Sequence, residues 1–324
     1  MNIKIGVKDK KLLSSILENA RKSYKQIAKE IGISKDAAEY RTKKLIENGI
    51  IKSFQARINL TNFVYGNYIL LAQLSNLSLE KEKEIFENLK KIKYALWLGK
   101  VGGEFDLFIS FSTKNLKQLG ETINEIFAIL GNIKKYSILT MTSELKDSFK
   151  SLFSDKKFEK LVTFDLALNE KLDSIDKKIL YILNKNSKVS NREVSEKVKI
   201  SEEAIRVRIK NLEKRKIIIN YRTILDENNL GLSQYILLLN FSNFNLKVQK
   251  QIEEYALNNK DIVFASRIVG EYNLILSIYA ENEQDFFEKL LELRNHFANS
   301  INFFTSLNVF STKYHNQLPE GILD

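Results

Sequence analysis

The chain has 324 residues, a length that suits several modest cores better than one small domain. It has no cysteine and only two histidines, which excludes disulfides and thiolate metal sites, so we expect neither a metal nor a cofactor. The net charge of +11 is uneven: residues 1–60 carry +8 and residues 173–228 carry +5, which leaves −2 for the rest. Concentrated basic charge is typical of phosphate binding, whereas a general lysine bias would spread it evenly.

No secretory signal pattern and no apolar run of about 20 residues occurs, so we expect a cytoplasmic protein that does not engage a membrane. The chain also repeats itself at an offset of 167 residues. Residues 9–60 share 14 identities in 52 with their counterparts, and YILLAQLSNLSL from Tyr68 matches YILLLNFSNFNL from Tyr235. The expected divisions are domains at 1–60, 61–142, 172–228 and 229–314, a connector at 143–171 and a loose tail at 315–324.

Residues 1–60 predict three short helices. Ser23 and Gln26 form a capping box before the second, and Ser34 caps a third over about 35–48. The helical phase turns Thr42 inward, where a hydroxyl without a partner would weaken packing. The basic and aromatic side chains on the outer face and flank of this third helix are Lys35, Tyr40, Arg41, Lys43 and Lys44.

Residues 61–142 predict a βαββαβ unit, with strands near 67–75, 94–101, 104–112 and 133–142 and helices near 79–91 and 115–130. The second copy repeats this order, with strands near 234–242, 262–269, 271–280 and 301–311 and helices near 246–258 and 283–298. This is the ferredoxin-like pattern, with both helices on one sheet face. Residues 69–74 and 236–241 are apolar at nearly every position, which predicts a partner sheet over the other face.

The connector at 143–171 is charged and lacks glycine and proline. It places Leu145, Phe149, Leu152 and Phe153 at helical spacing, which predicts a semi-rigid helical connector or a packed C-terminal extension of the first βαββαβ domain.

Residues 172–228 repeat the three helices and end in an extended arm. Ser190 and Glu193 form the second capping box, and Ser201 caps the third helix. An apolar stripe of Ile205, Ile209 and Leu212 faces inward, so Arg206 and Lys210 point outward and Arg208 lies on the flank. A helix with a buried stripe and an exposed basic face, following a tight turn, forms a helix-turn-helix.

These segments resemble the Lrp/AsnC family of transcriptional regulators, through LDSIDKKIL, SNREVSEKV, ISEEAIRVRIKNLE, the triplet 217–219 and LDENNLGL. The resemblance implies an α+β chain in which two winged-type helix-turn-helix modules alternate with two ferredoxin-like effector and dimerisation domains. It implies double-stranded DNA and a small effector, such as an amino acid, as partners. One polypeptide would then supply both halves of a dimer as an intramolecular pseudo-dimer, or chains would form a homo-oligomer, and ligand binding would shift the relative placement of the two readers.

In this interpretation the phosphates are positioned by Lys43, Lys44, Arg206 and Lys210. Arg41 and Arg208 reach a phosphate or a guanine edge, or else pair with a nearby glutamate on the helix surface. The two reading faces differ, because Glu39 and Tyr40 stand where the second copy has Arg206 and Val207. Unequal half-sites are therefore expected.

The turns between the middle strands resemble the family's G-x-x-D effector loop. The candidate effector residues are Gly102, Gly103 and Asp106 in the first loop, Gly270 and Asn273 in the second, and the hydroxyls of Ser137 and Thr305 in the last strands. A carboxylate next to glycine amides can accept an α-ammonium group. Asn273 replaces that acid, and a simple β-hairpin turn explains the same glycines.

We expect no enzyme, because there is no phosphate loop, nucleophile motif or metal-spaced cluster. An alternative comes from siroheme decarboxylases, which share these modules but carry a His-Cys-Tyr-Arg type segment where this chain has residues 265–268, Ala-Ser-Arg-Ile. Another alternative is a sensor or scaffold that no longer binds DNA, because Glu39, Glu202 and Glu203 weaken the positive field.

Overall fold

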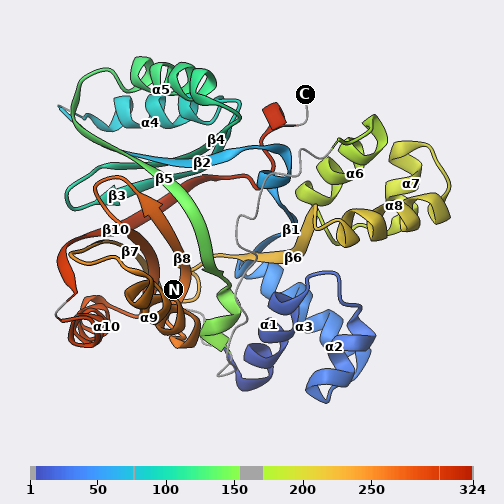
Figure 1. Ribbon diagram of the computed structural model, residues 1–324. Helices are drawn as coiled ribbons and strands as arrows, with labels where there is room; N and C mark the ends of the chain where they lie inside the picture. Colours follow the sequence, from blue (N-terminus) through green and yellow to red (C-terminus); the bar gives the residue numbers. More distant parts are fainter. Residues whose placement is uncertain (1–4, 76, 154–170, 299, 323–324) are drawn as a thin grey trace. The chain divides into compact units, whose positions relative to one another are not determined.

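The computed structural model of the chain describes residues 5–75, 77–153, 171–298 and 300–322. The described residues fall into two compact units, which alternate along the sequence. After the roles that the family resemblance implies, we call the first the reader unit, within Met1–Phe63 and Ala167–Gly231, and the second the sensor unit, within Val64–Leu166 and Leu232–Ile322. Each unit therefore gathers two like modules from the two copies of the repeat (Figure 1).

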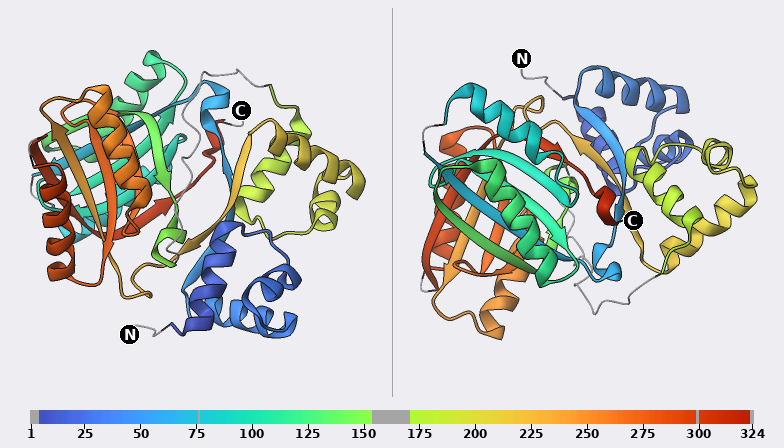
Figure 2. Two further views of the ribbon diagram at one scale, coloured as in Figure 1. Left: turned by 60° about the horizontal axis from the view of Figure 1, so that its bottom comes forward. Right: turned by 90° about the horizontal axis from the view of Figure 1, so that it is seen from above.

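The reader unit consists of two three-helix modules joined by one strand from each. The first module holds α1 (Val7–Glu18), α2 (Tyr24–Ile31) and α3 (Lys35–Glu47), and the second holds α6 (Ser174–Lys185), α7 (Asn191–Val198) and α8 (Glu202–Lys214). Both expected capping boxes are formed, at the starts of α2 and α7. Strands β1 (Ile51–Ile58) and β6 (Ile218–Leu225) pair antiparallel between the two helical clusters (Figures 1 and 2).

The sensor unit is an eight-stranded closed barrel built from two βαββαβ modules. The first contributes β2 (Gly66–Leu74), α4 (Leu79–Leu89), β3 (Ala95–Gly102), β4 (Leu107–Thr113), α5 (Leu116–Leu130) and β5 (Ile133–Asp147). The second contributes β7 (Ser233–Phe241), α9 (Leu246–Asn258), β8 (Ile262–Val269), β9 (Leu274–Ala280), α10 (Glu283–His296) and β10 (Ile301–His315). The strand order β10-β3-β4-β2-β5-β8-β9-β7 contains the ferredoxin-like order twice.

Each sheet has two covered faces, as the apolar runs predict. Helices α4 and α5 cover the outside of one sheet, and α9 and α10 cover the other (Figure 1). The inner faces pack against each other, with Ile69 and Leu71 of β2 in the same core cluster as Ile236 and Leu238 of β7. The partner sheet predicted from the sequence is thus the sheet of the other copy.

The last strand of each module is longer than expected because its second half pairs with the other module. In β5, Thr140 to Asp147 pair with β8, and in β10, Asn308 to His315 pair with β3. The first residues of the expected helical connector are therefore strand, and Leu145 lies in the core of the second module. A 3-10 helix, η2 (Phe149–Phe153), follows, and the remainder of the expected connector, 154–170, lies outside the described residues.

The described part of the C-terminal segment is packed rather than loose. Leu318 and Ile322 are buried, and a 3-10 helix, η3, spans Glu320–Ile322. The Tyr65 hydroxyl donates to the carbonyl of Gly321 at 3.1 Å. The expected loose tail is wrong for these residues because apolar side chains on both sides of the only proline are buried.

Candidate nucleic-acid interface and effector loops

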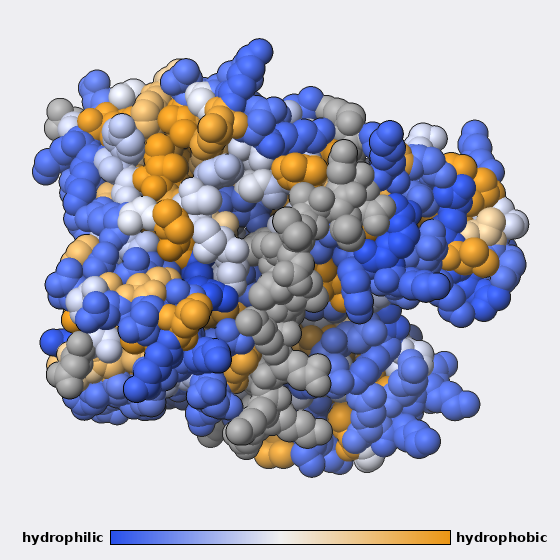
Figure 3. All heavy atoms as spheres, in the orientation of Figure 1, coloured by the Kyte–Doolittle hydropathy of each residue, from blue (hydrophilic) through white to orange (hydrophobic). Residues whose placement is uncertain are grey.

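The third helix of each three-helix module packs with the predicted phase. Ala38 and Leu45 are buried in α3, and Ile205 and Leu212 in α8. Thr42 is also fully buried, but its Oγ1 donates to the Ala38 carbonyl at 2.8 Å, so the expected unpaired hydroxyl is wrong. The predicted outward side chains are exposed: Lys35, Tyr40, Lys43, Lys44, Arg206 and Lys210. On the side seen in Figure 3, hydrophilic residues cover most of both modules.

Arg41 and Arg208 are half-buried, and each bonds to aspartate side chains at the start of the first helix of its own module. Arg41 Nη1 donates to Asp9 Oδ1 at 2.7 Å. Arg208 Nη1 donates to Asp173 Oδ2 at 2.7 Å and to Asp176 Oδ1 at 2.8 Å. The pKa of Asp173 lies below its usual value because its carboxylate accepts the Asp176 amide and then the Arg208 guanidinium. The sequence allows a glutamate as the partner of each arginine, whereas the partner in the structure is an aspartate. The repeated Asp-Lys-Lys at 9–11 and 176–178 is the sequence pattern that could have indicated it.

The outward side chains make few tight contacts with the rest of the protein. Lys44 Nζ lies 5.9 Å from the centroid of the Tyr40 ring, and Lys43 pairs loosely with Glu47 at 4.0 Å. Arg206 differs, because Glu203 holds it through two hydrogen bonds. The mutual hydrogen bonds lower the pKa of Glu203 and raise the pKa of Arg206.

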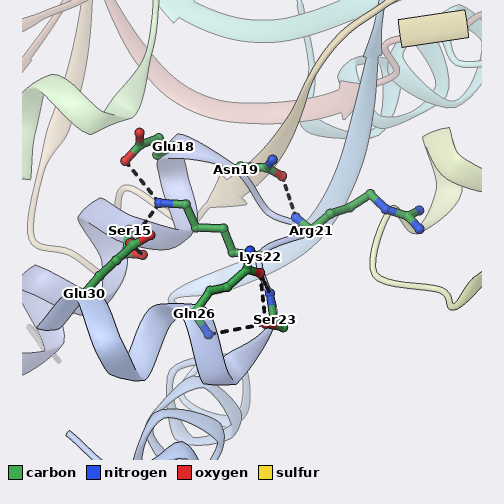
Figure 4. A network of polar contacts seen from close by, with 8 residues as sticks. All are labelled: Ser15, Glu18, Asn19, Arg21, Lys22, Ser23, Gln26 and Glu30. Atoms are coloured by element: carbon green, nitrogen blue, oxygen red, sulfur yellow. Dashed lines mark hydrogen bonds and ion pairs between the residues drawn. The ribbon is translucent and has the colours of Figure 1, made fainter. Parts of the chain in front are cut away.

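Two basic residues that sequence reasoning missed join the three-helix modules. Arg21 Nη1 donates to the Ser187 carbonyl at 3.2 Å and its Nη2 to Asn191 Oδ1 at 3.0 Å. Its repeat counterpart, Lys188, donates to the Lys22 carbonyl at 3.2 Å. In Figure 4 the Arg21 side chain extends away from the network in which Lys22 bridges Glu18 and Glu30.

The backbone reinforces this junction with matching bonds. The Ala20 amide donates to the Tyr221 carbonyl at 2.9 Å, and the Ser187 amide donates to the Phe54 carbonyl at 2.8 Å. Burial, and then the nearby Arg21 charge, lower the pKa of Lys188, because both disfavour its charged form. The two third helices therefore belong to one clasped body.

Each glycine loop of the sensor unit packs on the last strand of the other module. A Cβ added at Gly103, where φ is +122°, would lie 2.8 Å from the Ser306 carbonyl oxygen of β10. A Cβ added at Gly270, where φ is +145°, would lie 2.8 Å from Leu139 Cδ2 of β5. Gly102 lies under the ring of Phe310, also on β10. Each loop therefore does more than reverse the chain direction, because it also contacts the other module.

Asp106 and Asn273 use a side-chain oxygen in the same way. Asp106 Oδ2 accepts the Leu74 amide at 2.8 Å, and Asn273 Oδ1 accepts the Phe241 amide at 2.6 Å. Both bonds secure the end of the first strand of the module. The acid-to-amide difference between the copies therefore preserves the acceptor, which is a physical reason for the departure from G-x-x-D.

The predicted hydroxyls lie near the loop of the opposite module. Thr305 Oγ1 donates to Glu104 Oε2 at 2.8 Å and lies 2.9 Å from the Tyr272 hydroxyl, while Lys135 pairs with the same carboxylate. These bonds, first that of Lys135, lower the pKa of Glu104. Ser137 is half-buried and stands opposite Leu71 in β2, beside the strand residues that contact Gly270.

Among the described residues, every helix is too short or too polar to span a membrane. Within the same ranges, no group of three or more His, Asp or Glu side chains is arranged to hold a metal ion.

Comparison with known proteins identifies both three-helix modules. Residues 172–213 match the AsnC-type helix-turn-helix domain, and residues 7–52 match a winged helix-turn-helix DNA-binding model. An uncharacterised HTH-type transcriptional regulator of Pyrococcus furiosus is 30% identical over 145 residues, covering 45% of this chain and 97% of the relative. The HTH-type transcriptional regulator Ptr1 of Methanocaldococcus jannaschii is 31% identical over 142 residues, covering 44% and 95%.

Among solved structures, the siroheme decarboxylase NirDL is similar over 97% of this chain and 96% of that chain, with a TM-score of 0.64 and 12% identity. At that identity the likeness shows the fold alone.

Paired helix-turn-helix modules with exposed basic third helices, combined with a ferredoxin-like barrel, define a DNA-binding transcription regulator. The chain belongs to the Lrp/AsnC family of such regulators, in a form that carries both modules twice.

Proposed function

We propose that the chain binds a specific DNA operator with two unequal half-sites, one read by α3 and the other by α8. The observation that carries this proposal is the clasped reader unit, in which β1 and β6 pair antiparallel and hold two exposed basic helices in one body. Half-sites read by such a pair have a set separation on the duplex.

The proposed DNA contacts are the exposed residues Lys35, Tyr40, Lys43, Lys44, Arg206 and Lys210. Arg41 and Arg208 each give one nitrogen to an aspartate of the first helix. We propose that this pairing fixes the angle of the reading helix and leaves their remaining N–H groups for a nearby phosphate.

We further propose that a small effector, of the amino-acid class, acts through the glycine loops. Each loop meets the last strand of the other module, so a ligand there would contact both modules at once. Thr305 and Ser137 supply hydroxyls beside these contacts, and Asp106 supplies a carboxylate whose Oδ2 already accepts a backbone amide. Because the readers are clasped to each other, the effector would change operator affinity rather than the half-site spacing.

The binding proposal is tested by fluorescence anisotropy. The full chain is titrated into a duplex from upstream of its own gene, into duplexes from unbiased site selection and into a scrambled duplex, at low and physiological salt. The expected result is tighter binding to the selected duplex that persists at physiological salt, with log affinity falling steeply as log salt rises.

Equal binding to all duplexes, lost together as salt rises, would contradict sequence-specific reading. No binding at low salt would contradict DNA binding altogether. A shifted Soret band with added iron tetrapyrrole would then favour the chemistry of the enzyme whose fold this chain shares.

A further inference from the structure

The two reading helices carry opposite charges at one equivalent position. The repeat offset places Glu39 of α3 opposite Arg206 of α8. Both residues are exposed. Each lies in the second turn of its helix, since α3 begins at residue 35 and α8 begins at residue 202. The N-terminal part of a reading helix supplies the side chains that contact base edges, so the charge reversal falls where sequence is read.

Arg206 is oriented by its own helix. Its Nε donates to Glu203 Oε2 at 2.8 Å, and its Nη2 donates to the other carboxylate oxygen. An exposed pair of this kind adds little stability. It does restrict the direction of the guanidinium plane, and the Nη1 end keeps N–H groups free to donate. Such an edge matches O6 and N7 of guanine.

Glu39 has the opposite chemistry. Asp36 occupies the position equivalent to Glu203, so this face of α3 is acidic where α8 has an ion pair. Among the described residues, no cation forms an ion pair with Glu39. A carboxylate on a reading face accepts a hydrogen bond from the N4 amino group of cytosine and repels the acceptor edge of guanine.

We propose that α8 reads a guanine through Arg206, oriented by Glu203, and that α3 reads a cytosine through Glu39 at the equivalent place. The two half-sites of the operator therefore differ in sequence, and the chain binds the operator in one orientation. This assignment rests on the proposed function and deepens it. It replaces the phosphate-positioning role that the sequence indicates for Arg206.

The test uses the full chain in site selection, followed by competition anisotropy on duplexes that differ in one base pair. Wild-type protein should select half-sites that differ at the equivalent pair. Arg206→Gln should reduce the preference for guanine in one half-site about 10- to 100-fold and leave the other half-site unchanged. Glu39→Gln should relax the cytosine half-site only, and the double exchange Glu39→Arg with Arg206→Glu should reverse the polarity.

Arg192→Gln is the matched control. Arg192 forms an exposed ion pair on α7, its Nε 3.2 Å from Glu196 Oε1, and α7 is not the reading helix. This variant should weaken all duplexes alike. If Arg206→Gln gives the same uniform loss with no change of base preference, or if the selected half-sites are identical at that pair, the inference is overturned while sequence-specific binding stands. If wild-type protein prefers no sequence, both the inference and the proposed function fail.

Discussion

The contact between the two sensor modules depends on one glycine in each loop. Gly103 adopts a φ of +122°, which L residues rarely adopt, and an added Cβ would lie 2.8 Å from the Ser306 carbonyl oxygen. Positive φ costs an L residue about 1–2 kcal/mol. A backbone oxygen in a barrel strand cannot rotate away as a side chain can, so the loop must move off β10.

We therefore expect Gly103→Ala to lower the free energy of unfolding by about 2–4 kcal/mol, from backbone strain together with overpacking. Gly270→Ala should lower it by about 1–3 kcal/mol, because the closest atom to its added Cβ is a leucine methyl group. Gly120→Ala is the control. Gly120 is exposed within α5 with no atom within 4 Å of an added Cβ, so this change should raise stability by about 0.5–1 kcal/mol.

The assay is urea denaturation of the full chain followed by tryptophan fluorescence. The single tryptophan, Trp97, lies on β3 opposite His315 of β10, so its signal reports on the barrel. If Gly103→Ala matches wild-type stability, or if Gly120→Ala loses as much as Gly103→Ala, the reasoning from the loop contact is wrong.

Three further predictions concern single side chains. Asp106→Asn should keep the bond to the Leu74 amide and change stability little, whereas Asp106→Ala should cost about 1–2 kcal/mol in urea denaturation. If the Asp106 carboxylate also binds the effector ammonium group, Asp106→Asn should abolish the effector response in the anisotropy assay even though it changes stability little. Lys146 is buried, its ammonium donates to the carbonyls of Ala256 and Asn259, and burial lowers its pKa from 10.5 to about 8. The unfolded chain then binds more protons than the folded chain between pH 8 and 10.5, so wild-type stability should rise relative to Lys146→Met across that window, by up to about 3 kcal/mol. Equal pH profiles would contradict a buried, charged lysine. Arg208→Gln should lower stability by about 1 kcal/mol at low salt and less at high salt, whereas a loss independent of salt would contradict an ion-pair role.

Local signals made much of the fold predictable. The two capping boxes and the inward stripes of α3 and α8 are determined within a few residues of sequence, and they form as expected. The apolar runs of β2 and β7 predict a second covering sheet without showing which sheet it is. The repeat supplies that information, because two copies in one chain place a partner sheet at high local concentration.

Features that depend on contacts distant in sequence could not be predicted. Nothing in the local sequence distinguishes Arg21 and Lys188 from other basic residues, and only the pairing of β1 with β6 brings them against the other module. The second half of β5 read as a helix because Leu145 and Phe149 share helical spacing, whereas strand pairing across modules decides its conformation. In the candidate site, the sequence places Arg41 on the flank of the third helix but does not identify its partner Asp9 on α1, because the two residues lie 32 positions apart.

In the proposed function, one chain presents both readers as a single clasped body. This arrangement is tested by measuring affinity for a series of duplexes in which the spacing between the two selected half-sites changes one base pair at a time. With the readers clasped, we expect one sharp optimum, with affinity falling steeply within a few base pairs and recovering at most weakly after a full turn of about 10 base pairs. Equal affinity at every spacing would show that the readers move independently, and would contradict the clasp.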